Sequence, residues 1–175
     1  MVLKPQDIVV ALKIVAMPED KRDSWSYASL AIEIGMSPAE VHAGIKRLVA
    51  ARLGGRINDR FSPSVQALKE FLLHGIRYVF VPDLGEVTRG MVTGFSAPPL
   101  SSIISQGDEL PYVWPDPEGE VRGVSFSPLY KCVPVAARKD MALYELLVLV
   151  DAIRGGRARE REVAVKELEK RLADR

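Results

Sequence analysis

Four basic side chains and four small or polar ones lie close together between residues 37 and 60 of this chain. Lysine and arginine hold phosphate oxygens or donate to the edge of guanine. Small side chains allow a helix to approach base edges closely, so this combination predicts a surface that contacts double-stranded DNA. Its members are Ser37, Ala39, His42, Ala43, Lys46, Arg47, Arg56 and Arg60.

Two short helices joined by a tight turn are predicted to position these residues. Ser26 is a favourable N-cap for the first helix, and Gly35 suits a left-handed stop at its end. Ser37 begins the second helix, with Pro38 at its first position and Glu40 completing a Ser-x-x-Glu capping box. Two helices joined in this way allow the second one to enter a DNA major groove.

The segments on either side extend this prediction. Residues 4–15 form an amphipathic helix before the pair, and Gly54 and Gly55 permit a sharp bend into a short basic hairpin after it. In that hairpin, Arg56 and Arg60 would follow the DNA backbone or enter a minor groove. Capped helices with a glycine turn also occur in domains that bind no nucleic acid, so a purely structural role is the alternative interpretation.

Four segments of this region carry a resemblance to a known family: Ala28-Ser29-Leu30-Ala31, Gly35-Met36-Ser37, Val41-x-x-x-Ile45-Lys46-Arg47-Leu48 and Leu53. Through them, residues 4–61 resemble the winged-helix domain of bacterial MarR-type transcriptional regulators. The resemblance implies a homodimer that binds a pseudo-palindromic operator, with the second helix reading bases. The chain departs from the family in its very short hairpin, which lacks a clear second strand, and in the pattern beyond Phe61. A second resemblance is to the regulator halves of abortive-infection-type toxin–antitoxin pairs.

Composition restricts the class of protein. The 175 residues are 47% hydrophobic with a formal net charge of +1, which is typical of a globular chain and not of a polycation. Cys132 is the only cysteine, so no disulfide forms within the chain, as suits a reducing cytoplasm. The N-terminus does not resemble a signal peptide, and no apolar run is long enough to span a membrane. We therefore expect a cytoplasmic protein without a membrane segment.

The predicted fold class is α+β and mainly helical, with a winged helix-turn-helix domain at residues 1–62 and a mixed C-terminal region at residues 63–175. The C-terminal region contains breakers and no clear periodicity over residues 83–112, which predicts a functional loop, an arm or a surface segment. Around it the pattern predicts a helix over 63–74, a β-rich run at 78–81, a helical turn at 100–105, a β-hairpin of 112–114 with 121–126, and helices over 140–153 and 157–173.

Residues that could carry catalysis are scarce. His42 and His74 lie far apart in the sequence, and a single cysteine cannot build a cysteine-based zinc site. We expect no enzyme, no cofactor and no metal, and we rank an enzyme that uses residues 83–126 last. The favoured function is a DNA-binding transcriptional regulator, with the apolar helix 141–153 either as a homodimer interface or as core. The alternative is an antitoxin-like module that binds a protein partner through its C-terminal region.

Overall fold

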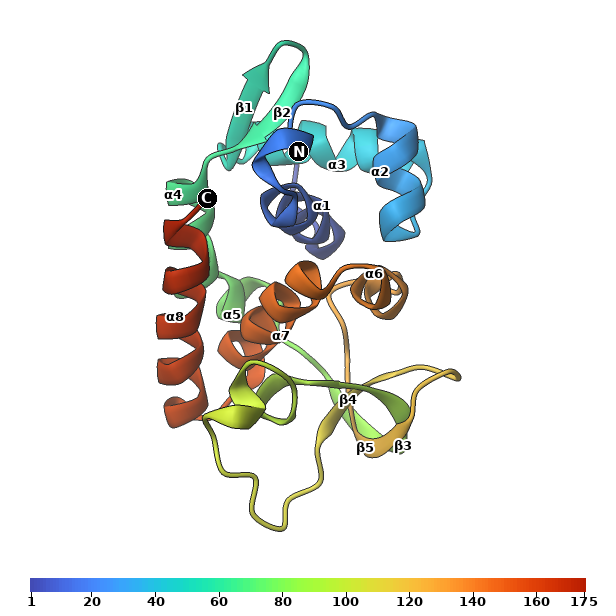
Figure 1. The fold of residues 1–175 in the computed structure, drawn as a ribbon, viewed down its shortest axis with the longest axis vertical. Helices are drawn as coiled ribbons and strands as arrows, with labels where there is room; N and C mark the ends of the chain where they lie inside the picture. The colour runs from blue at the N-terminus through green and yellow to red at the C-terminus, as the bar shows by residue number, and fades with distance from the viewer.

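Helix α1 (Pro5–Ala16) begins the fold and lies among the other N-terminal elements (Figure 1). Pro5 and the Asp7 carboxylate, which accepts from the Lys4 amide at 2.8 Å, fix its start. Residues 7–16 are all buried, as is typical of a helix that other elements surround. The computed structural model describes all 175 residues, and the elements up to residue 63 are η1 (Glu19–Lys21), α2 (Tyr27–Ile34), α3 (Pro38–Ala50), β1 (Gly54–Ile57) and β2 (Arg60–Pro63).

The predicted helix ends around the turn are confirmed. The Ser26 hydroxyl accepts from the Ser29 amide at 3.1 Å, and Gly35 ends α2 with a φ of 72°. At the start of α3, the Glu40 amide donates to the Ser37 hydroxyl at 3.2 Å, and the Ser37 amide donates to the Glu40 carboxylate at 2.8 Å. This reciprocal capping box fixes the direction in which α3 leaves the turn.

The segment after α3 is a true two-stranded hairpin. β1 and β2 pair antiparallel with Ile57 opposite Arg60, which leaves a loop of only two residues. Asn58 and Asp59 in that loop have φ values of 50° and 61°. Positive φ at both central residues defines the type I′ turn, whose twist suits paired strands. Asn58-Asp59 is the local signal for this turn, and residues 60–63 form the second strand that was not predicted.

The C-terminal part contains more elements than the sequence predicted, and α8 runs along one side of the molecule toward the N-terminal part (Figure 1). The helix predicted over 63–74 begins later, since the Ser64 hydroxyl caps it by accepting from the Ala67 amide at 3.2 Å. The elements are α4 (Val65–His74), α5 (Ile76–Val79), β3 (Leu84–Thr93), η2 (Gly94–Ser96), η3 (Leu100–Ser102), β4 (Tyr112–Pro115), β5 (Val121–Phe126), α6 (Val133–Lys139), α7 (Met141–Gly155) and α8 (Ala158–Ala173).

The strand predicted at residues 78–81 is wrong. Residues 76–79 form the single turn of α5, and the Phe80 amide donates to the Ile76 carbonyl at 2.9 Å. Ile76 is fully buried, whereas Tyr78 and Val79 are exposed. The β-branched and aromatic composition of this run indicated a strand, but burial of Ile76 against the core favours the helical turn.

The predicted hairpin of residues 112–126 is also wrong. β4 and β5 lie parallel, and both pair antiparallel with β3, so that the three strands close into a small barrel. The connection between β4 and β5 passes across β3 where Gly119 lies against Gly90. A Cβ atom on Gly119 would collide with the backbone of Gly90, and a Cβ atom on Gly90 would collide with the carbonyl group of Trp114 on β4. Because both residues are glycine, the chain can cross β3 at close range, and this crossing replaces the predicted hairpin turn.

A single hydrophobic core extends across the boundary predicted between residues 62 and 63. It includes Leu12 and Ile45 from the N-terminal part, and Leu147 and Leu168 from the C-terminal part. Residues 146–154 of α7 are buried. The apolar helix 141–153 is therefore core, and its apolar face does not lie free as the candidate dimer interface.

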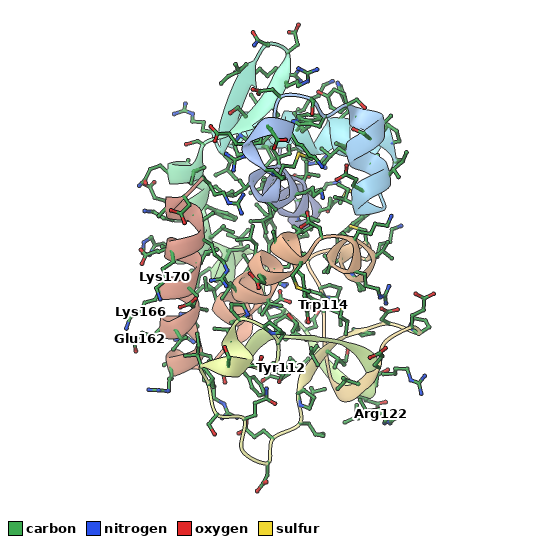
Figure 2. All side chains as sticks on the ribbon, in the orientation of Figure 1. Tyr112, Trp114, Arg122, Glu162, Lys166 and Lys170 are labelled. Atoms are coloured by element: carbon green, nitrogen blue, oxygen red, sulfur yellow. The ribbon has the colours of Figure 1, made fainter.

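Asp151 of α7 holds the barrel onto the helices. Its carboxylate accepts from the Thr93 hydroxyl at 2.8 Å, from the Trp114 indole at 2.7 Å and from Arg154 at 2.7 Å. Figure 2 shows Trp114 in the interior, between the barrel and α7. Burial raises the pKa of Asp151, while Arg154 and the two hydrogen bonds oppose that rise. Each polar group of this network has a partner, which is the condition for a buried network to stabilise a fold.

Candidate nucleic-acid interface

The outward face of α3 carries most of the residues predicted to contact DNA. Ser37, Ala39, His42 and Lys46 are exposed, and Ala43 is half-buried. The opposite face of the helix is fully buried in the core. Lys46 forms no ion pair within the chain, so its ammonium group is free to bind a phosphate.

His42 is held in place from α2. The Tyr27 ring meets the imidazole edge to face, with 5.2 Å between ring centroids, and Trp25 packs in the same way on Tyr27 at 5.6 Å. Such aromatic pairs have preferred geometry and restrict the rings that form them. An exposed imidazole packed against this aromatic pair can offer its ring nitrogen atoms to a base edge.

Arg47 does not belong to the outward face, which corrects the prediction for this residue. Its guanidinium makes a bidentate pair with Asp7 of α1, with Nε 2.8 Å from Oδ2 and the terminal nitrogen 2.7 Å from Oδ1. The Arg47 side chain is 14% exposed and that of Asp7 is 0% exposed. The pair raises the pKa of Arg47 and joins α1 to α3, and the neighbouring Gly44 leaves room for the carboxylate. Arg47 is therefore a structural residue.

The hairpin places further cations beside α3. Arg56 is exposed on β1 and forms no ion pair within the chain. Arg60 is also exposed, but its Nε donates to the Trp25 carbonyl at 3.1 Å, which leaves only its terminal nitrogens free. Arg60 thus ties β2 to the start of α2 as well as presenting charge.

Arg52, which was outside the eight predicted residues, joins this surface. It ends α3 in a left-handed conformation with a φ of 62°, and its amide donates to the Val49 carbonyl at 3.0 Å. The Leu53 amide donates to the Leu48 carbonyl, which completes a helix-ending motif that usually contains glycine at this position. A side chain in this conformation costs about 1 kcal/mol. Arg52 thus carries an exposed positive charge at a backbone position that usually favours glycine.

The C-terminal region contacts the start of α3 through Tyr130. Its hydroxyl donates to the Glu40 carboxylate at 2.6 Å, and this bond, with those from Ser37, lowers the pKa of Glu40 to about 2. A carboxylate in the first turn also interacts favourably with the helix dipole. The capping role of Glu40 is local and was predicted, whereas nothing in the sequence indicates its partner ninety residues later.

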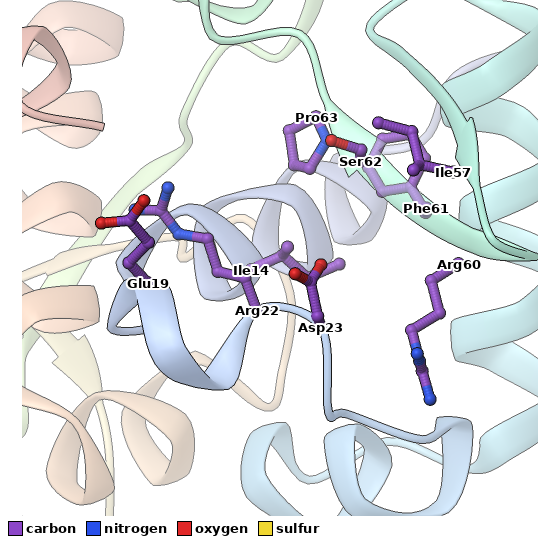
Figure 3. Close-up of a pocket in the computed structure, with 9 residues that line it drawn as sticks. All are labelled: Ile14, Glu19, Arg22, Asp23, Ile57, Arg60, Phe61, Ser62 and Pro63. Carbon is purple, nitrogen blue, oxygen red and sulfur yellow. The ribbon is translucent and has the colours of Figure 1, made fainter.

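A pocket of about 230 Å³ lies between the hairpin, η1 and α1 (Figure 3). Arg22 on its wall is already used, because it donates to the carbonyl groups of Met17 and Val15 at the end of α1. Glu19 and Asp23 line the same pocket. Arg60 also lines this pocket, so two arginines and two carboxylates face it and the pocket has no excess of positive charge.

The remaining reactive residues are separate from one another. Burial raises the pKa of the Cys132 thiol to about 12, so this cysteine is a packed side chain at neutral pH. His74 is exposed at the end of α4. No cluster of three or more histidine, cysteine or acidic residues is placed to hold a metal ion. None of the helices combines the length and the apolar character that crossing a membrane requires.

Comparison with known proteins gives no family for this chain. No family model, no characterised protein and no solved structure matches it. The surface formed by α3 and the hairpin carries four exposed cations, Lys46, Arg52, Arg56 and Arg60.

Proposed function

We propose that this chain is a sequence-specific, double-stranded DNA-binding regulator of transcription that inserts α3 into a major groove. The observation that carries the proposal is the outward face of α3. Small side chains at its start, Ala39 and Ala43, allow close approach, and the unpaired Lys46 follows one turn later. In this proposal α1, α2 and α3 with the β1–β2 hairpin form a winged helix-turn-helix of MarR type.

Each residue of the surface has a distinct role in this proposal. Ser37, Ala39, His42 and Ala43 approach base edges, whereas Lys46, Arg56 and Arg60 hold phosphates. Arg52 is a further phosphate contact in this proposal. Arg47 is not one, because the Arg47 guanidinium is already bonded to Asp7. We further propose that the protein acts in the cytoplasm without cofactor or catalysis, as a homodimer whose interface lies outside the buried face of α7.

Selection of bound duplexes from a random pool tests the proposal, followed by affinity measurements over a range of salt concentrations. Loss of one phosphate contact reduces the slope of log affinity against log salt by about 0.9. We expect this change for Lys46→Ala and for Arg56→Ala. Lys166→Ala is the matched control, because Lys166 is an exposed lysine on α8 whose partner is Glu162 (Figure 2). A selection that enriches no sequence would refute sequence-specific binding.

A second candidate function is an antitoxin-like module that binds a protein partner through its C-terminal region. One observation favours it: five large apolar side chains are exposed within a single segment that includes α5 and the start of β3. Soluble proteins seldom expose such clusters without a partner. A stable complex with another protein, in a chain that binds no duplex at low salt, would favour this function over the first.

A further inference from the structure

The barrel has an unpaired strand edge at the N-terminal half of β3. β5 pairs with residues 84–90 along one edge of β3, whereas β4 pairs only with residues 90–93 along the other. Residues 84–88 therefore have a neighbouring strand on one side alone. A free edge presents N–H and C=O groups that another extended chain can join as an added strand.

Large apolar side chains are exposed on the first half of β3 and on the chain that leads into it from α5. Each of them is at least 45% exposed. Leu84 and Val87 lie on the free edge itself, and exposed apolar side chains on such an edge are a hazard for aggregation unless a partner covers them. The five side chains are Tyr78, Val79, Val81, Leu84 and Val87.

Two arginines lie directly opposite each other on β3 and β5. Arg89 faces Arg122 across the strand pair, and Val87 faces Val124 two residues along, on the same side of the sheet. Both arginines are exposed, and neither forms an ion pair within the chain. Figure 2 shows Arg122 at the outer side of the barrel. Like charges directly opposite each other destabilise a strand pair.

Arg138, by contrast, has ion-pair partners within the chain. Arg138 on α6 pairs with Asp116 and Glu118 in the loop between β4 and β5. The chain thus supplies carboxylates for Arg138 but none for Arg89 and Arg122. The missing negative charge at this pair points to a ligand from outside the chain.

We propose that the free edge of β3 binds an extended, acidic segment of a partner protein. The segment adds a strand along residues 84–88, places a carboxylate against Arg89 and Arg122, and packs apolar side chains on Leu84 and Val87. A nucleic acid fits this surface less well, because a phosphodiester backbone offers neither strand pairing nor apolar side chains. The barrel and α3 lie at opposite ends of the molecule (Figure 1), so this binding does not depend on the proposed DNA contact.

The test uses random twelve-residue peptides displayed on phage and selected against the full chain. We expect enrichment of peptides that alternate acidic and apolar residues, with the strongest one binding measurably as a synthetic peptide in fluorescence anisotropy. The double variant Arg89→Ala with Arg122→Ala should bind that peptide at least tenfold more weakly than the unmodified chain does. The unmodified chain should in turn bind at least tenfold more weakly to a peptide with lysine in place of each acidic residue. Arg56→Ala on the hairpin is the control and should bind the peptide like the unmodified chain.

Hydrogen exchange supplies the second readout. Binding of the selected peptide should protect backbone amides in residues 84–88 and leave those of α3 unchanged. The proposal is overturned if no peptide is enriched, if the double arginine variant binds as tightly as the unmodified chain, or if protection falls elsewhere. It is also overturned if sedimentation shows self-association that Val87→Lys abolishes, since the occupant is then a second copy of this chain.

Discussion

Replacing Arg47 by alanine distinguishes a structural arginine from a DNA-binding one, with its neighbour Lys46 as an internal control. The two residues stand side by side in the sequence and were predicted to share one function. In the structure Lys46 is exposed and unpaired, whereas Arg47 forms two hydrogen bonds of 2.8 and 2.7 Å with the fully buried Asp7. Arg47→Ala should therefore destabilise the fold, and Lys46→Ala should not.

The size of the effect follows from what Asp7 loses. Without Arg47, the buried carboxylate keeps only the bond from the Lys4 amide. Breaking a buried pair by removal of one partner costs about 3–5 kcal/mol. Because the Arg47 side chain is 14% exposed, water can reach part of the vacated site, and we take the lower value of about 3 kcal/mol. In a protein of this size that corresponds to a fall in melting temperature of about 6–12 °C.

Urea unfolding followed by circular dichroism measures both variants. Lys46→Ala should change the free energy of unfolding by no more than about 0.5 kcal/mol, as is usual for an exposed residue. The double replacement of Asp7 and Arg47 by leucine should recover much of the lost stability, because no buried charge remains unpaired. If Arg47→Ala unfolds like the unmodified chain, or if Lys46→Ala is the more destabilised variant, the assignment of Arg47 to the core is wrong.

Three further predictions concern the C-terminal region. Asp151→Asn leaves the buried Arg154 without its counter-ion and should lower the free energy of unfolding by about 3 kcal/mol in urea. Tyr130→Phe removes the bond that lowers the pKa of Glu40 to about 2, so this pKa should rise toward 4.5 in an NMR titration. Ionised Glu40 stabilises the fold above about pH 4.5 and loses this effect as the pH falls to about 2, so the variant should be less stable at neutral pH. Native Cys132 should react with a disulfide reagent at pH 8 more than tenfold more slowly than in the unfolded chain, because burial raises its pKa to about 12 and leaves far less of the reactive thiolate.

Each of these predictions has a result that contradicts it. An Asp151→Asn variant as stable as the unmodified chain would show that Arg154 does not need the charge. A Glu40 pKa that stays near 2 without the Tyr130 hydroxyl would assign its shift to the helix start alone. Equal thiol reactivity in the native and unfolded chains would place Cys132 at the surface.

The N-terminal half shows how far local sequence patterns determine structure. Ser26, Gly35 and the Ser37–Glu40 capping box act through hydrogen bonds within three or four residues, and all of them were predicted correctly. Arg47 turns away from the outward face because it pairs with Asp7, forty residues earlier in the chain. No pattern within α3 distinguishes Arg47 from Lys46.

The barrel shows where local patterns fail. β3 contains Gly85 and Gly90, which indicate a break in the chain, and its strand character depends on pairing with β4 and β5, which follow much later in the sequence. The hairpin interpretation of 112–126 used a correct local signal, the turn-forming residues after Trp114. That local signal does not reveal that Gly119 lies against Gly90, where the chain crosses β3. The helix Met141–Gly155, with its Asp140 cap, was predicted because its cap and apolar run are local.

The most direct test of the proposed function compares duplex binding by the unmodified chain with that of Lys46→Ala, at several salt concentrations, on the sequence selected from a random pool. We predict that Lys46→Ala binds more weakly at low salt, has a shallower salt dependence by about 0.9 in slope, and unfolds at an unchanged urea concentration. Equal affinity and equal slope for the two proteins on that duplex would contradict α3 as the DNA-binding helix.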